Sequence, residues 1–296
     1  MVDDLRLGQF KKRTTCHPQP EINKAGTTMH TPLEKYFAQR VKNLFNNLHD
    51  FELNGDDVSL HDLRVEMKKL RSIIKFFKQV YPKQKVKKAG HILHAIFQQA
   101  GEIREYQILQ QWLQKNQFAA IEKTYLPPER LEIMIQRFRL NSNANKNDLK
   151  EIIEQVSHLV HSTNEILAEQ YYTELNAKVA KMCRRKLPEA DWHELRKLIK
   201  QRIYAYNWVR HDTENDDPLF SYYNKLQELI GQWHDADIIK DVFSQKQIYL
   251  SQDIDVQKDF SPAWDKIMAT LKQKEKQVED MLSRYPLQQA QQQAAD

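Results

Sequence analysis

Long stretches without glycine or proline run through this chain, and they leave few alternatives to a bundle of helices. The sequence of 296 residues contains only six Gly and ten Pro. It also has few long runs of the β-branched residues that favour strands. Apolar residues instead recur every three or four positions, which is the spacing of one face of an α-helix. With 41% hydrophobic residues to form a core, the chain is predicted to be all-α.

Turn-forming residues divide the chain into a series of predicted helices. The predicted breaks are Asn54-Gly55, Pro82, Pro127-Pro128, the polar run 141–147, Pro188, Asp217-Pro218 and Pro262. His234 and Asp235 are interpreted as the cap of a new helix. Residues 1–28 lack periodicity, and residues 287–296 are polar and low in complexity, so both are expected to be tails around a helical domain at 29–286.

Two sequence matches at almost the same offset predict an internal duplication of about 130 residues. The matched segments are 61–68 with 193–200, at an offset of 132, and 100–113 with 230–243, at an offset of 130. Chance supplies one such match more readily than two in the same order. We therefore expect two related helical bundles, residues 29–145 and 146–286, arranged about a pseudo-twofold axis.

One predicted helix of the first half carries a stripe of basic side chains. The stripe consists of His61, Arg64, Lys68, Arg71 and Lys75. Spacings of three and four residues place these side chains within an arc of about 80° and over roughly 20 Å, opposite an apolar side. Stacked like charges repel one another unless an anion neutralises them. The stripe predicts a site for a long anion, and a solvated basic surface is the simpler alternative.

The second half repeats this stripe with fewer cations and more neutral donors. Its members are His193, Arg196 and Lys200, and it continues to Tyr204, Asn207 and His211. If the halves pack symmetrically, the two stripes can line a shared basic groove. Lys69 is a further candidate in the first half, although it points about 80° away from the edge of the stripe.

Lys87, His91 and His94 share one face of the helix predicted after Pro82. They could extend the anion-binding surface, or they could simply make the end of that helix soluble. His91 with His94, and His158 with His161, have the i, i+3 spacing that can bind a metal. Neither pair is part of an HExxH arrangement. We therefore predict neither a metal site nor a cofactor.

Several classes of function lack their sequence motifs. The chain has no P-loop glycine pattern, no GxSxG, no Cys/His nucleophile pair in a plausible context, and no acidic cluster for two metal ions. No run approaches 18 apolar residues, and the N-terminus lacks the features of a signal peptide. The two cysteines do not suggest a disulfide framework. We expect a cytoplasmic protein that is neither an enzyme nor inserted in a membrane.

These motifs resemble those of the CHAD family, the histidine-containing α-helical domain. The resemblance rests on HDLRVEMKKLR (61–71), HELRKLIK (193–200) and the glycine-containing segments 100–113 and 230–243, and it spans about residues 30–285. It implies two helical bundles related by duplication around a basic central groove. It also implies binding of inorganic polyphosphate, and a location at polyphosphate granules.

The resemblance is stronger in the first half. The family's first motif has His, Arg, a pair of basic residues and another Arg, and this chain has His61, Arg64, Lys68, Lys69 and Arg71 there. The second motif usually has Arg before Tyr, whereas this chain has Ile203 before Tyr204. The first glycine segment commonly ends in Arg-Asp, and here Arg104-Glu105 stands there, matched by His234-Asp235 in the second half. We therefore expect a weaker anion contact from the second half.

The leading hypothesis is non-enzymatic binding of inorganic polyphosphate by the two stripes. A nucleic-acid or nucleoid-associated protein that uses the same surface is the main alternative, because both ligands are polyanions. A phosphohydrolase and a scaffold for protein partners are more remote alternatives. The net charge of +5 alone does not distinguish them, because the position of the charges matters more than their sum.

Overall fold

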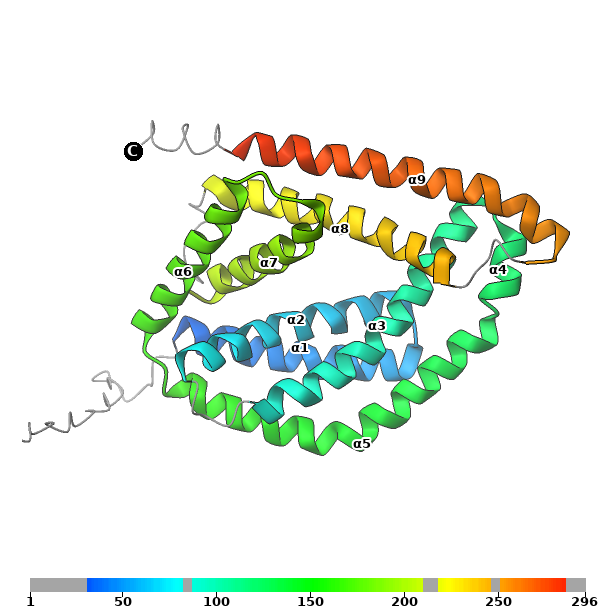
Figure 1. The fold of residues 1–296 in the computed structure, drawn as a ribbon. Coiled ribbons are helices and arrows are strands. Elements are labelled where there is room, and N and C mark those ends of the chain that lie inside the picture. Colours follow the sequence, from blue (N-terminus) through cyan, green and yellow to red (C-terminus); the bar gives the residue numbers. More distant parts are fainter. Residues whose placement is uncertain (1–30, 82–86, 210–217, 246–250, 286–296) are drawn as a thin grey trace, which may run out of the picture. The chain divides into compact units, whose positions relative to one another are not determined.

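The computed structural model shows that the chain is built of helices throughout the residues that it describes (Figure 1). It describes residues 31–81, 87–209, 218–245 and 251–285, without the side chains of residues 87–89 and 218. All of these except Thr31 belong to one compact unit, Pro32–Asp296. The predicted tails 1–28 and 287–296 lie outside the described residues. The predicted all-α fold is confirmed.

The helices of the first and second halves follow one another in a similar order. They are α1 (Pro32–Asn54), α2 (Asp57–Val80), α3 (Lys87–Asn116), α4 (Ala119–Tyr125), α5 (Pro128–His161), α6 (Glu165–Cys183), a short 3-10 helix (Glu189–Asp191), α7 (Trp192–Val209), α8 (Pro218–Gln245) and α9 (Ile254–Ser283). Helix α2 packs against α1 and α3, and α7 packs in the same way against α6 and α8. The starts of α3 and α8, at Lys87 and Pro218, are 218 − 87 = 131 positions apart. These correspondences are what a repeat requires, and the duplication itself stays a prediction.

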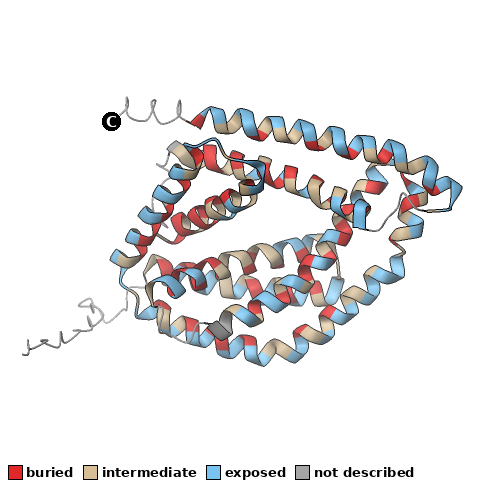
Figure 2. Cartoon of the chain, in the orientation of Figure 1, coloured by how far each residue is buried: buried red, intermediate tan, exposed pale blue. Residues whose placement is uncertain are grey.

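The buried hydrophobic side chains form two clusters. Figure 2 marks where buried residues lie along the helices. The first cluster lies mainly among α1, α2, α5, α6, the start of α3 and the end of α7. The second lies mainly among α8, α9, the end of α3 and the start of α7, with α4 beside it. Phe76 of α2 packs against Tyr171 of α6 and Trp208 of α7, with ring centroids 5.0 and 5.2 Å apart. These aromatic contacts bury apolar surface between α2 and α7. The apolar core thus fixes the two helices that carry the basic stripes.

The predicted break at 141–147 is wrong, because α5 continues through it from Pro128 to His161. Ser142 Oγ donates a hydrogen bond to Glu52 Oε1 of α1 (2.6 Å), and Asn145 Nδ2 donates to the carbonyl of Asn141 (2.7 Å). These bonds satisfy polar side chains that otherwise compete with the helical backbone. The predicted boundary between the halves, at 145/146, therefore falls inside a continuous helix.

Two other predicted helix starts are wrong. His234 and Asp235 do not cap a helix, because they lie inside α8. Helix α9 begins before Pro262, at Ile254, where the Asp253 carboxylate accepts hydrogen bonds from two backbone N–H groups. Proline removes a backbone donor from a helix. Buried residues on both sides of it, including Val256 and Ala263, keep α9 packed against α8.

Candidate anion-binding site

Helix α2 carries the first basic stripe, and its start is fixed by Asp56. The Asp56 carboxylate accepts hydrogen bonds from the backbone N–H groups of Val58 (2.9 Å) and Ser59 (2.8 Å), which caps the helix. The apolar side of α2 is buried at Leu63, Met67, Leu70, Ile74 and Phe77. The stripe lies on the opposite side, as predicted, and its residues are half-buried or exposed.

Four of the predicted cations come together where α2 contacts α7. They are Arg64 and Lys68 of α2 and Arg196 and Lys200 of α7, which we call the cation cluster. All four are half-buried. The positive charges of Lys200, Arg64 and Arg196 all act on Lys68, whereas the carboxylate of Asp235 on α8 acts in the opposite direction. The structure thus places residues from both predicted stripes within electrostatic reach of one another.

Burial and repulsion by neighbouring cations destabilise the protonated forms of both lysines in the cluster. Burial, and to a lesser degree the neighbouring cations, lower the pKa of Lys68 to about 7. Burial and Arg196 lower the pKa of Lys200 to about 8, against the opposing effect of Asp235. Both ammonium groups therefore lack enough negative charge around them. An anion bound beside the two lysines would supply this negative charge.

Arg64 is held against α3 by a hydrogen bond and an aromatic ring. Its Nη1 donates to the backbone carbonyl of Phe97 (3.1 Å), and its guanidinium lies 4.5 Å from the centre of the Phe97 ring. Arg71 and Lys68 lie over the same ring, at 4.7 and 5.8 Å. Such cation–π contacts order cationic side chains without neutralising them. Burial lowers the pKa of Arg64 to about 10, and Glu105 of α3 partly opposes this.

Arg196 is held against α8 in a corresponding way. Its Nε donates to the backbone carbonyl of Gln227 (3.2 Å). Burial lowers the pKa of Arg196, and the carboxylate of Asp235 opposes the effect. Each arginine thus donates to a carbonyl of the following helix, α3 or α8. An acidic residue of that helix, Glu105 or Asp235, also supports its charge.

Histidines lie at the start of each stripe. Desolvation lowers the pKa of His61, and the positive charge of Arg104 on α3 lowers it further. The rings of His193 and His234 have centroids 4.6 Å apart. Desolvation also lowers the pKa of both, and His234 and Arg196 respectively add to the effect. Neutral imidazoles are therefore favoured near pH 7, and a bound anion would favour their charged forms.

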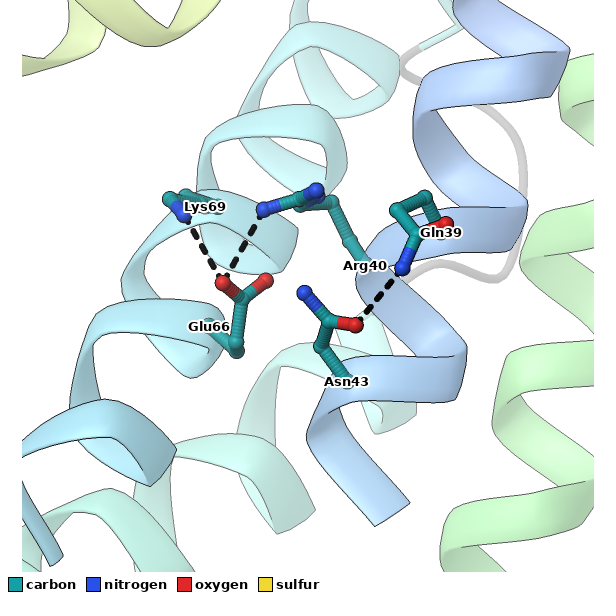
Figure 3. Close-up of polar contacts among 5 residues, drawn as sticks. All are labelled: Gln39, Arg40, Asn43, Glu66 and Lys69. Atoms are coloured by element: carbon teal, nitrogen blue, oxygen red, sulfur yellow. Dashed lines mark hydrogen bonds and ion pairs between the residues drawn. The ribbon is translucent and has the colours of Figure 1, made fainter. Parts of the chain in front are cut away.

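Lys69 is paired with an acid and does not join the cation cluster. Its Nζ lies 2.7 Å from Oε1 of the buried Glu66, and Arg40 Nη1 of α1 lies 3.0 Å from the same oxygen (Figure 3). The Arg40–Glu66 pair therefore links α1 to α2, and Lys69 shares the same carboxylate. Tyr204 is half-buried near Glu66 and Arg196, and burial raises its pKa to about 12. It is therefore a neutral hydrogen-bonding group beside the cluster.

The remaining predicted residues lie away from the cation cluster or cannot be placed. Lys75 is exposed near the end of α2 and donates to Gln201 Oε1 of α7 (2.6 Å). His91 and His94 are exposed on α3. The side chain of Lys87 lies outside the described residues. An anion longer than the cluster could reach Lys75, and the part played by the other three stays a prediction.

Three residues around the arginines are absent from the residues predicted for the site. They are Phe97, Glu105 and Asp235. The two acids had a signal in the sequence, because they occupy the same position in the matched segments 100–113 and 230–243. Phe97 had none, because its counterpart 130 positions later is Gln227. Its role follows only from the packing of α2 against α3.

Replacing Glu66 with Gln is expected to lower the free energy of unfolding by about 1–3 kcal/mol, as measured by urea denaturation. The substitution keeps the shape of the side chain but leaves Lys69 and Arg40 without their shared carboxylate. Glu174→Gln is the matched control, because its pair with Lys178 (3.6 Å) is exposed on both sides. That change is expected to cost less than about 0.5 kcal/mol. Equal losses in both variants would contradict the role given to Glu66.

Two further features concern the described residues, a membrane-spanning helix and a metal-binding cluster. No helix among them is long and apolar enough to span a membrane. They also contain no group of three or more His, Cys, Asp and Glu side chains that could hold a metal ion.

The fold and the site define an all-helical protein in which two basic helices, α2 and α7, meet at a cation cluster. The sequence profile of the CHAD domain matches residues 35–244, and the chain belongs to this family. The crystal structure of the CHAD domain from the plant Ricinus communis has a similar fold, with a TM-score of 0.62 and 15% sequence identity, over 92% of this chain and 97% of that one. A comparison with curated protein sequences gives no match. The predicted family is confirmed, and the matched residues include the whole cation cluster.

Proposed function

We propose that this chain binds inorganic polyphosphate and does not hydrolyse it. The observation that carries the proposal is the convergence of Arg64, Lys68, Arg196 and Lys200 from two helices, with Asp235 as the acid that acts on both lysines. Arginine can bind phosphate oxygens through parallel hydrogen bonds, and lysine adds a compact charge. Membership of the CHAD family is consistent with this ligand.

The half-buried position of the cation cluster favours a thin and flexible polyanion. A phosphate chain has no sugars or bases, so each unit can approach recessed side chains closely. Duplex DNA is stiff over tens of nanometres and can reach such side chains only from outside. Single-stranded nucleic acid commonly uses exposed aromatic rings for stacking, whereas Phe97 is covered by Arg64 and Arg71. These features favour polyphosphate over nucleic acid.

Charge pairing alone accounts for the proposed function, because binding requires no bond to be made or broken. The sequence has none of the nucleophile or phosphate-loop motifs considered above. A protein with this function would be located wherever the polymer accumulates, such as cytoplasmic polyphosphate granules. The cluster would be one of the points at which the polymer is held.

Titration with polyphosphates of graded length, and with single-stranded and duplex DNA of equal total charge, tests the proposal. At low salt we expect tighter binding of polyphosphate, with affinity rising until the polymer spans both stripes. If four cations contact the polymer, the logarithm of the association constant should fall linearly with the logarithm of the salt concentration, with a slope of about −3. Equal or tighter binding of either DNA would instead favour a nucleic-acid-binding protein.

The same samples decide whether the polymer is only bound. With Mg²⁺ or Mn²⁺ present, we expect the length of the polyphosphate to remain unchanged and no phosphate to be released. Phosphate release that scales with protein concentration would contradict the non-enzymatic proposal and favour a phosphohydrolase.

A further inference from the structure

We propose that Gly231 and Gly101 are positioning residues that hold Arg196 and Arg64 in the anion-binding site. The inference rests on the proposed function, because it concerns the same site. Both glycines lie inside helices, at buried positions of α8 and α3. Glycine is among the poorest formers of a helix interior. Its presence at both positions therefore calls for a local reason, and the packing of the arginines supplies one.

Gly231 leaves space for the whole guanidinium of Arg196. A Cβ atom at position 231 would lie 2.9 Å from Nη2, 3.1 Å from Nε and 3.3 Å from Cζ of Arg196. Three atoms of one rigid, planar group would thus be closer than ordinary van der Waals contact. The guanidinium could relieve the overlap only by moving as a unit. That movement would break the hydrogen bond from Nε to the carbonyl of Gln227.

Gly101 has the corresponding relation to Arg64, but the contact is looser. A Cβ atom there would lie 3.0 Å from Nη1 and 3.9 Å from Cζ. Only one nitrogen would be too close, so a shift of the guanidinium by a few tenths of an ångström would relieve the overlap. The Phe97 ring, 4.5 Å from the guanidinium, would still hold the side chain in place. The same substitution is therefore expected to disturb Arg64 less than Arg196.

This arrangement orders each arginine while leaving donors for a ligand. A guanidinium has several N–H donors in a fixed plane, and each arginine uses one of them on a helix carbonyl. The hydrogen bond and the glycine surface together restrict the rotamer of the side chain. A site whose cations are already ordered loses less conformational entropy when an anion binds. The glycines therefore act through the arginines on affinity.

Gly231→Ala and Gly101→Ala test the inference, with Gly90→Ala as a matched control on α3. At position 90 a Cβ atom would approach only the tip of the flexible Lys78 side chain, with Nζ at 2.5 Å. We expect polyphosphate affinity to fall about tenfold for Gly231→Ala, about twofold to threefold for Gly101→Ala, and not at all for Gly90→Ala. The loss of affinity in Gly231→Ala should not be accompanied by a lower melting temperature, because alanine is a better helix former than glycine.

A double-mutant cycle shows whether the glycine acts through the arginine. Lysine at position 196 carries a charge but has no planar guanidinium to pack against the helix. Gly231→Ala should therefore lose most of its effect on affinity when combined with Arg196→Lys. The same loss in both backgrounds would overturn the inference, because position 231 would then act independently of Arg196.

A measurement without ligand separates failure of this inference from failure of the proposed function. The ¹⁵N NMR signal of the Arg196 Nε–H group reports its bond to the carbonyl of Gln227. We expect Gly231→Ala to shift this signal and accelerate its hydrogen exchange, whereas Gly90→Ala leaves it unchanged. An unchanged signal in Gly231→Ala overturns the inference. If the wild-type chain fails to bind polyphosphate, the proposed function fails, and this signal still decides the positioning role.

Discussion

Arg64→Glu combined with Arg196→Glu is expected to abolish polyphosphate binding at low salt, with a loss of affinity of more than about 1,000-fold. Each substitution removes a half-buried cation and adds a carboxylate in its place. The new carboxylates would also lie near Glu105 and Asp235, which act on these arginines in the wild-type chain. The site would then repel a polyanion instead of attracting it. Equilibrium titration with a long polyphosphate measures the loss.

Arg130→Glu combined with Arg137→Glu is the matched control. Both arginines are exposed on α5, and the pair changes the net charge by the same amount. We expect the control to lose less than about fivefold in affinity, because exposed charges outside the site act through screened, long-range attraction. Similar losses in the two pairs would show that net charge, and not the cation cluster, determines binding.

Arg64→Gln combined with Arg196→Gln separates the loss of charge from charge reversal. Without added carboxylates, we expect a loss of about 100-fold, between the control and the reversed pair. Circular dichroism and thermal unfolding of every variant establish that the fold is retained. Full affinity in the neutral pair would contradict the assignment of these arginines to the site.

The stripe on α2 could be predicted from the sequence because it depends on local geometry alone. Spacings of three and four residues determine which side chains share a helix face, whatever the helix packs against. The buried residues Leu63, Met67, Leu70, Ile74 and Phe77 confirm the predicted apolar side. Predicting that α7 lies against α2 required more than local geometry. The matched motifs predicted a second stripe, and the contact of α7 with α2 brings it to the first.

Pairing between helices could not be predicted in the same way. Lys69 has the same chemistry as Lys68 and is adjacent to it, yet it pairs with Glu66, the carboxylate that Arg40 also contacts. The choice depends on the rotation of α2 against α1, which no spacing in the sequence specifies. The role of Phe97 was equally hard to predict, because an apolar residue of an amphipathic helix is ordinarily assigned to the hydrophobic core.

The predicted helix ends were wrong at two places where tertiary contacts outweigh local conformational preference. The polar run 141–147 has the composition of a loop, but Ser142 is bonded to Glu52 of another helix. Pro262 ordinarily breaks a helix, but burial of neighbouring residues such as Ala263 keeps α9 continuous. In both places the stabilising groups come from other elements. Local propensity therefore gave the right kind of structure and the wrong limits.

The two halves hold their arginines by the same backbone interaction but surround them differently. Arg64 has the Phe97 ring and a second arginine beside it, whereas Arg196 lies near the neighbouring His193 and His234 rings. The first half thus has more permanent charge, and the second has more groups that change charge near neutral pH. At neutral pH the second half is therefore still expected to make the weaker contact with an anion. It should become stronger as the histidines gain protons.

Polyphosphate affinity is expected to rise by roughly 100-fold as the pH falls from 9 to 6. In the free protein, the pKa of Lys68 is about 7 and that of Lys200 about 8, because burial and the surrounding cations disfavour their charged forms. The charged groups that act on Lys68 are Lys200, Arg64, Arg196 and Asp235, and those that act on Lys200 are Arg196 and Asp235. Both lysines are therefore largely neutral at pH 9 and charged at pH 6. A bound anion raises both pKa values, so binding takes up protons.

Calorimetry near pH 8, in buffers with different ionisation enthalpies, measures this uptake directly. We expect on the order of one proton taken up for each occupied site. Lys68→Arg combined with Lys200→Arg is the discriminating variant, because arginine keeps its charge across this range. It should bind at pH 9 more tightly than the wild type and show little proton uptake. A long polyphosphate is used because its few end groups then contribute a negligible number of protons. Equal uptake in wild type and variant would place the titrating groups elsewhere, and a flat pH profile in the wild type would show that the lysines stay charged in the free protein.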